Sequence, residues 1–129
     1  MVRLTHLKTG RNLHSHGIPA PLSRGDNEVT GFGDDGEGDA GDNWRVECLH
    51  RKDSQKTSKP AWTADVVVRF AHMDTGAFLS GSPKTKFTSS NCPNCPVIGE
   101  LEVSGKSRNG VSKAQSSIFR ADDGVYLHL

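Results

Sequence analysis

Three histidines stand in the N-terminal stretch VRLTHLKTGRNLHSH, residues 2–16. Histidine side chains bind metal ions and transfer protons near neutral pH. His14 and His16 are two residues apart, so on a strand they share one face and could offer two ligands to a metal. A zinc site needs further ligands, and none stands at a recognised spacing. The sequence therefore predicts no metal site here, and it predicts that His14 and His16 are surface positions.

The acidic run GDDGEGDAGD, residues 33–42, invites comparison with a calcium-binding loop. An EF-hand loop needs glycine at its sixth position and glutamate at its twelfth. Counted from Asp34, those positions are Asp39 and Arg45, so the EF-hand pattern fails. The run is typical of a solvated glycine and aspartate hairpin loop. Weak calcium binding outside the EF-hand pattern is the alternative.

Cys92-Pro93-Asn94-Cys95 has the spacing of a redox dithiol. The thioredoxin type of dithiol lowers its thiol pKa at a helix N-terminus, whereas this motif lies among Pro, Ser and Asn with no helix pattern after it. Half of a zinc knuckle is another interpretation, but the second half is absent. We predict a local disulfide between Cys92 and Cys95, formed in an oxidising compartment, with Cys48 free or buried.

Catalytic chemistry is not indicated elsewhere in the sequence. We find no Ser/His/Asp arrangement, no glycine-rich phosphate loop and no carboxylate pair in apolar surroundings, so we expect no enzyme and no cofactor. A net charge of +1 does not favour nucleic acid as a partner. No apolar run approaches the roughly 20 residues of a membrane span. The best candidates for polar ligand contacts are Arg3, Arg11 and Arg69.

An internal repeat organises the chain. Five pairs of matching words occur in the same order: Val2–His6 with Val68–His72, Lys8–Gly10 with Asp74–Gly76, Leu13–Ser15 with Leu79–Gly81, Glu28–Gly31 with Glu102–Gly105, and Trp44–Val46 with Phe119–Ala121. The fourth pair requires eight extra residues in the second copy. Residues 49–65 form a polar connector, and residues 81–100 form a long loop.

Each copy alternates apolar and polar residues with a period of two, which is typical of half-buried strands. Lys8-Thr9-Gly10 and Asp74-Thr75-Gly76 are predicted hairpin turns, because glycine tolerates a positive φ. No segment has a convincing helical period, and residues 124–129 alternate like a closing strand. The sequence predicts an all-β chain. Its alternation also predicts that His6 and His72 occupy equivalent, largely buried positions.

Four-stranded units that repeat in this way suggest a β-trefoil. The segments VRLTHLKTGRNLHSH, GDNEVTGFGDDGEGDAGDNWRVEC, AWTADVVVRFAHMDTGAFLS and DDGVYLHL resemble the MIR domain, which protein O-mannosyltransferases and intracellular calcium-release channels share. Within that group, the chain is most similar to the stromal cell-derived factor 2 family. The likeness is most specific over residues 2–48 and less so over 62–80 and 102–129.

This resemblance implies an all-β, MIR-type β-trefoil over residues 1–129, with one repeat over 2–61 and another over 62–129. The family has three repeats, and this chain matches the second and third. We therefore expect either an incomplete trefoil from a fragment or a two-repeat variant. The sequence shows neither a signal peptide nor a retention tail.

The resemblance also implies a function. It implies a non-enzymatic protein of the endoplasmic-reticulum lumen that works in protein quality control with a J-domain co-chaperone, the lumenal Hsp70 and unfolded secretory clients. A MIR module of, or partner to, a protein O-mannosyltransferase that binds carbohydrate or acceptor peptide is the second hypothesis. We expect partner contacts on the 81–100 loop and on the acidic loop, residues 34–42. The candidate binding residues are Arg11, His14, His16, Asp34, Asp35 and Glu37.

Overall fold

The computed structural model describes residues 1–49, 62–64, 66–111 and 115–122. Most of the predicted 49–65 connector, the boundary between the predicted repeats and the predicted closing strand at 124–129 lie outside these described residues. Within them the chain is almost entirely strand and turn, and its one α-helix, α1 (Arg108–Val111), is a single turn. The all-β prediction is confirmed.

The strands fall into two successive sets of four. The first set contains β1 (Thr5–His6), β2 (Arg11–Pro19), β3 (Asn27–Phe32) and β4 (Trp44–Cys48), with the 3-10 turn η1 (Ala40–Asp42) before β4. The second set contains β5 (Val67–His72), β6 (Phe78–Lys86), β7 (Leu101–Lys106) and β8 (Phe119–Arg120), with the 3-10 turn η2 (Gln115–Ser117) before β8. We call these sets the first and second units.

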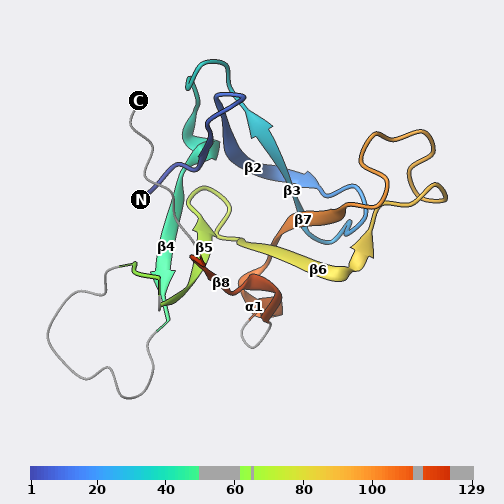
Figure 1. The fold of residues 1–129 in the computed structure, drawn as a ribbon. Coiled ribbons are helices and arrows are strands. Elements are labelled where there is room, and N and C mark those ends of the chain that lie inside the picture. The colour runs from blue at the N-terminus through green and yellow to red at the C-terminus, as the bar shows by residue number, and fades with distance from the viewer. Residues whose placement is uncertain (50–61, 65, 112–114, 123–129) are drawn as a thin grey trace, which may run out of the picture.

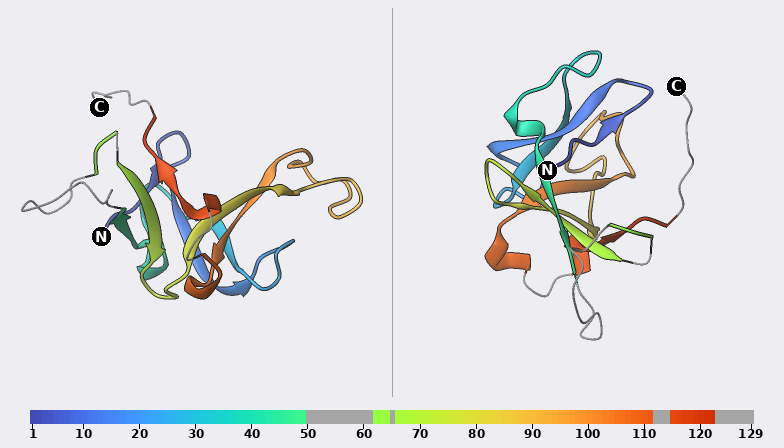
Figure 2. Two further views of the ribbon diagram at one scale, coloured as in Figure 1. Left: turned by 90° about the horizontal axis from the view of Figure 1, so that it is seen from below. Right: turned by 90° about the vertical axis from the view of Figure 1, so that its left-hand side faces the viewer.

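All eight strands belong to one curled antiparallel sheet (Figure 1). Seven of them follow the order β1-β2-β3-β7-β6-β5-β4, and β8 pairs with β5 on the edge opposite β4. Pairing of β3 with β7 joins the two units at Asn27 and Gly105. The sheet also returns on itself, because Val2 forms an isolated bridge with Trp44 at the start of β4. The two views of Figure 2 show this curl from below and from the side.

The core lies inside the curl and is centred on Trp44, whose side chain is fully buried together with Val68, Phe70 and Leu79. The indole Nε1–H of Trp44 donates to the main-chain oxygen of Leu13 at 3.0 Å, so the largest core side chain has its only polar atom satisfied. Strands β2, β3 and β8 contribute Leu13, Val29 and Phe119 to the edge of this core, and Val68 and Phe70 of β5 are two residues apart on one face, as the period of two predicts.

The hairpin turns agree with the sequence. Gly10 and Gly76 have φ values of +68° and +73°, which are left-handed conformations that favour glycine. The predicted loop at 81–100 is shorter than expected, because β6 continues to Lys86. Residues 81–86 are therefore strand, and the loop that projects beyond the sheet spans 87–100 (Figure 1).

Candidate functional site

A buried carboxylate organises the acidic side of the first unit. Asp42 is fully buried and accepts hydrogen bonds from His14 Nδ1 at 2.8 Å, Asn12 Nδ2 at 3.1 Å and the main-chain N–H of Asp39 at 3.0 Å. Burial by itself raises the pKa of Asp42, but the hydrogen bonds, led by that of His14, outweigh it and hold this pKa below its ordinary value. Asp42 therefore stays ionised and fixes the ring of His14.

The position of His14 corrects the sequence prediction. His14 is buried and His16 is half-buried, so neither is the surface residue we expected. They do share one face of β2, with ring centroids 5.0 Å apart. The physical reason is that η1 packs over this face, and a Cβ atom on Gly41 would stand only 2.4 Å from Cε1 of His14. His16 Nε2 donates to the Glu28 carboxylate at 2.9 Å.

Three potential metal-ligand atoms, from His14, Asp39 and Asp42, lie within 4.8 Å of one another. Each of these side chains already has a partner in the same network. Asp39 accepts from the main-chain N–H of Gly41 at 2.8 Å and, with Asp42, forms a capping box at the start of η1. The geometry is that of a hydrogen-bonded turn, and it gives these atoms a structural role.

An aromatic platform lies beside this network. Phe32, at the end of β3, is 40% exposed, and its ring stacks on His14 with centroids 4.5 Å apart. The exposed Asp39 lies 3.5 Å from His14 Nδ1. The platform therefore combines an accessible aromatic ring with an acidic group nearby. Sequence reasoning did not place Phe32 against His14.

An open apolar groove of about 610 Å³ lies on the face of the first unit formed by β1, β2 and β3. Its apolar lining consists of Leu4, Leu13 and Val29, with Val103 contributed by β7; the other lining residues are Thr5, His6, Thr9, Arg11, Asn12, Thr30 and Gly31. Val103 is 43% exposed. Sequence reasoning missed this groove, because it needs the pairing of β3 with β7.

The groove is open because β1 is an edge strand. In the second unit, β5 pairs along one edge with β4 of the first unit. The counterparts of Leu4 and Leu13, which are Phe70 and Leu79, are buried. Among the described strands, only β2 pairs with β1. His6 is consequently exposed, and the prediction that it is buried like His72 is wrong. His72 is buried as predicted.

The two histidines nevertheless make the same local contact. Nδ1 of His6 lies 2.9 Å from the Thr9 hydroxyl, and Nδ1 of His72 lies 2.9 Å from the Thr75 hydroxyl. In both turns the glycine N–H donates to the histidine carbonyl oxygen. The repeated histidine is therefore a turn residue in each unit, and only the second one is also covered by a neighbouring unit.

The acidic loop lies beside one rim of the groove. The N–H of Gly36 donates to the carbonyl oxygen of Gly10 at 3.0 Å, and Arg11 Nη2 lies 3.6 Å from the Asp34 carboxylate. Asp34, Asp35 and Glu37 are all exposed. Four of the six predicted binding residues (Arg11, Asp34, Asp35 and Glu37) thus lie at this rim or on the loop joined to it, while His14 and His16 belong to the neighbouring network.

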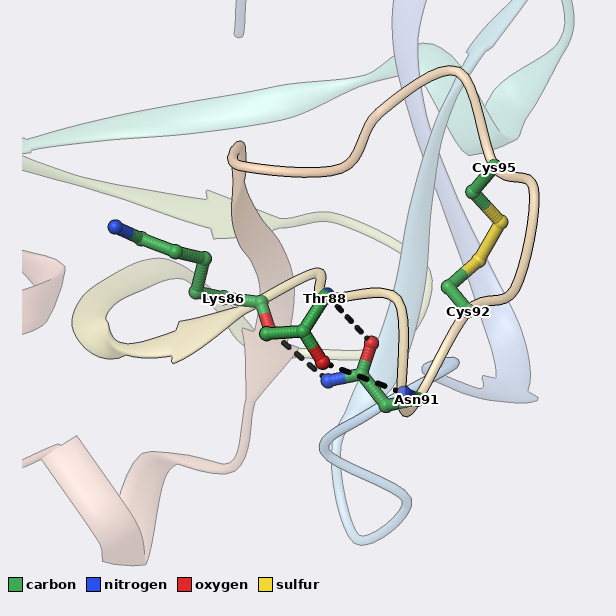
Figure 3. Close-up of a disulfide and its surroundings, with 5 residues drawn as sticks. All are labelled: Lys86, Thr88, Asn91, Cys92 and Cys95. Atoms are coloured by element: carbon green, nitrogen blue, oxygen red, sulfur yellow. Dashed lines mark hydrogen bonds between the residues drawn. A yellow bond between two sulfur atoms is a disulfide. The ribbon is translucent and has the colours of Figure 1, made fainter.

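Cys92 and Cys95 lie in the projecting 87–100 loop, where a disulfide joins them with Cα atoms 5.5 Å apart (Figure 3). Cys48 is a free, half-buried cysteine in β4. The loop does not contact the acidic loop through any hydrogen bond among the described residues. The two segments in which we expected partner contacts are therefore separate surfaces.

No helix in the described parts of the chain is long and apolar enough to cross a membrane.

Comparisons with known proteins agree with this architecture. The MIR domain family matches residues 1–92. A stromal cell-derived factor 2-like protein of Dictyostelium discoideum is 38% identical over 127 residues, which are 98% of this chain and 51% of that protein. Protein O-mannosyl-transferase 2 of Danio rerio is 44% identical over 86 residues, 66% of this chain and 11% of that protein.

The crystal structure of the SDF2-like protein from Arabidopsis thaliana superposes with a TM-score of 0.73 at 34% identity, covering 98% of this chain and 60% of that one. The curled sheet is accordingly of the β-trefoil type. The chain spans about half the length of the Dictyostelium relative. By its family match and by homology over nearly its whole length, the chain belongs to the MIR-domain family and, within it, to the stromal cell-derived factor 2 group.

Proposed function

We propose that this protein is a non-enzymatic binding module of protein quality control that holds extended apolar segments of unfolded polypeptides in the groove. The open groove with its acidic rim is the observation that carries this proposal. Leu4, Leu13, Val29 and Val103 offer apolar contacts. Among the described strands β1 pairs only with β2, so its other edge offers main-chain groups to an added strand.

The charges at the rim of the groove indicate which residues should flank the bound polypeptide segment. Asp34, Asp35 and Glu37 are exposed next to the Thr9–Arg11 end of the groove. They favour an apolar segment flanked by lysine or arginine over one flanked by acidic residues. In this proposal the protein works in the lumen of the endoplasmic reticulum with a J-domain co-chaperone and the lumenal Hsp70, as its family membership suggests.

A matched pair of valines tests the groove. Val103 lines it, whereas Val97 is similarly exposed, at 40%, but lies on the 87–100 loop. Fluorescence anisotropy with a labelled extended peptide, apolar in its centre and flanked by lysines, should show at least about tenfold weaker binding for Val103→Glu, because a buried apolar contact is lost. Val97→Glu should bind like the wild type. Equal binding by both variants would contradict the proposal.

The partners need a separate experiment. A pull-down from lumenal extract should recover a J-domain protein and the lumenal Hsp70 with the wild-type chain, and less of both with a variant in which Asp34, Asp35 and Glu37 are changed to Ser. Recovery of neither protein by the wild type would remove the partner part of the proposal. Peptide binding would then stand by itself.

The Phe32 platform favours a second candidate function, which is binding of carbohydrate or of an acceptor peptide for O-mannosylation. An exposed aromatic ring with an acidic group nearby is an arrangement that suits sugar binding, and protein O-mannosyl-transferase 2 of Danio rerio contains a related segment. NMR titration with mannose should shift the signals of Phe32 and its neighbours, and Phe32→Ala should abolish the shifts. A mannose response without peptide binding would make this the leading function.

A further inference from the structure

The disulfide loop has no counterpart in the first unit. The strands β2 and β3 are joined by residues 20–26, whereas β6 and β7 are joined by residues 87–100, which is twice as many. This longer loop carries both Cys92 and Cys95. In Figure 1 it projects beyond the end of the sheet, on the side away from β4.

Hydrogen bonds hold the loop without help from the disulfide. At its neck the N–H of Phe87 donates to the oxygen of Glu100 at 2.9 Å, and the N–H of Gly99 donates to the oxygen of Phe87 at 2.8 Å. Inside it, the Asn91 side chain accepts from the N–H of Thr88 at 2.8 Å and donates to the oxygen of Lys86 at 2.9 Å. Figure 3 shows this Asn91 network set apart from the sulfur atoms.

The disulfide connects two residues of one turn. The N–H of Cys95 already donates to the carbonyl oxygen of Cys92 at 3.2 Å, so the covalent bond joins no separate elements of the fold. A disulfide that closes so short a loop adds little to the stability of the folded chain. The bond is therefore poorly placed to staple the structure, and it can open while the sheet and core stay intact.

Accessibility and surroundings suit exchange with another polypeptide. Both cysteines are half-buried in a loop whose other residues from 88 to 100 are exposed. Val97 and Ile98, which follow Pro96, are 40% and 45% exposed, so nothing in the described loop blocks the approach of another chain to the pair. Accessible disulfides of this kind are the ones that react in thiol–disulfide exchange.

We propose that the Cys92–Cys95 pair is a thiol–disulfide exchange site that accepts two electrons from a dithiol of another polypeptide. A thiolate of the partner attacks one sulfur atom of the pair, the Cys92–Cys95 bond breaks, and the second sulfur leaves as a thiolate that takes a proton from water. The partner's other thiolate then attacks the partner sulfur of the mixed disulfide, the sulfur–sulfur bond between the two chains breaks, and the protein sulfur leaves as a thiolate that also takes a proton from water. The partner leaves with a disulfide, and Cys92 and Cys95 are both thiols. This activity goes beyond the proposed binding function and does not depend on it.

The oxidised full chain and a reduced synthetic peptide with two cysteines provide the test. We expect one peptide disulfide per protein molecule, measured by alkylation and mass spectrometry, and none with Cys92→Ser or Cys95→Ser. Cys48→Ser, which changes the free cysteine of β4, should leave this stoichiometry unchanged. With Cys48 also changed to Ser, each single variant at position 92 or 95 keeps one thiol and should give a one-to-one mixed disulfide with glutathione disulfide.

A second readout separates exchange from a structural role. In a Trp62→Phe background, which leaves Trp44 as the single tryptophan, the fluorescence emission should stay unchanged when the pair is reduced, because Trp44 is fully buried in the core. A red shift of the emission on reduction would show that the bond holds the fold and would overturn the proposal. A pair that stays oxidised in the folded chain despite excess peptide dithiol, and opens only in denaturant, would overturn it as well.

Discussion

The imidazole Nε2 of His72 lies 2.8 Å from the carbonyl oxygen of Gly41, so the second unit holds the η1 turn of the first through a buried hydrogen bond. A carbonyl oxygen only accepts, which means that Nε2 carries the proton. Nδ1 of the same ring faces the Thr75 hydroxyl and is free to accept from it. His72 therefore connects the turn of its own unit with the turn of the unit before it.

His72→Ala should lower the free energy of unfolding by about 2–3 kcal/mol, because it leaves a cavity and an unsatisfied buried carbonyl oxygen. His6→Ala is the matched control, since His6 makes the same contact with its threonine but is exposed. It should cost no more than about 0.5 kcal/mol. Urea denaturation followed by far-UV circular dichroism measures both. Similar losses for the two variants would contradict the role given to the Gly41 contact.

Stability should fall in acid through Asp42. A carboxyl whose pKa is lower in the folded than in the unfolded chain stabilises the fold above its unfolded pKa of about 4, and this contribution disappears as the pH falls toward the folded pKa. The hydrogen bonds of His14, Asn12 and Asp39 give Asp42 such a lowered pKa against the effect of burial. The urea midpoint should therefore drop below about pH 4.

Asp42→Asn should be less stable than the wild type at pH 6 and should lose less of its stability between pH 6 and pH 3. Glu47→Gln is a useful comparison, because burial raises the pKa of Glu47 but the hydrogen bonds of Arg45 and Arg108 hold it below its ordinary value. Glu47 is partly exposed, so its share of the acid loss should be smaller. An acid loss in Asp42→Asn as steep as in the wild type would exclude Asp42 as the main cause.

The local features of the fold could be predicted from sequence, because strand alternation and turn glycines are local signals. Gly10 and Gly76 adopt the positive φ that their hairpins require. Burial could not be predicted in the same way. His6 and His72 have matching sequence neighbours, yet one is exposed and the other buried. The reason is that β5 has β4 beside it in addition to β6, whereas among the described strands β1 has only β2.

The candidate site was predicted only in part for a related reason. Alternation places His14 and His16 on one face of β2, but it does not reveal that η1 packs on that face. Asp42, which stands 28 residues after His14 in the chain, becomes its partner only in the folded structure. The groove depends in the same way on Val103, which the β3–β7 pairing brings next to the first unit.

The groove should also cause the isolated chain to self-associate. Half-buried Leu4, Leu13 and Val29 remain open to solvent on one side, and the edge of β1 can pair with another strand. Static light scattering should show a mean mass that rises with concentration, and Val103→Glu should reduce this rise, whereas Val97→Glu should not. A monodisperse monomer that melts cooperatively at high temperature would mean that the two units close without a partner.

The acidic loop should control how fast basic partners arrive. Asp34, Asp35 and Glu37 are exposed, and Arg11 reaches only Asp34, at 3.6 Å, so most of this negative charge faces solvent. Exposed charges speed the encounter with a partner of opposite charge, and salt screens them over about 8–10 Å.

Stopped-flow association with the lysine-flanked peptide should therefore slow as salt rises from 0.05 M to 0.5 M. A variant with these three residues changed to Ser should start slower and depend less on salt, with a nearly unchanged dissociation rate. If wild type and variant respond equally to salt, the acidic loop does not steer this encounter.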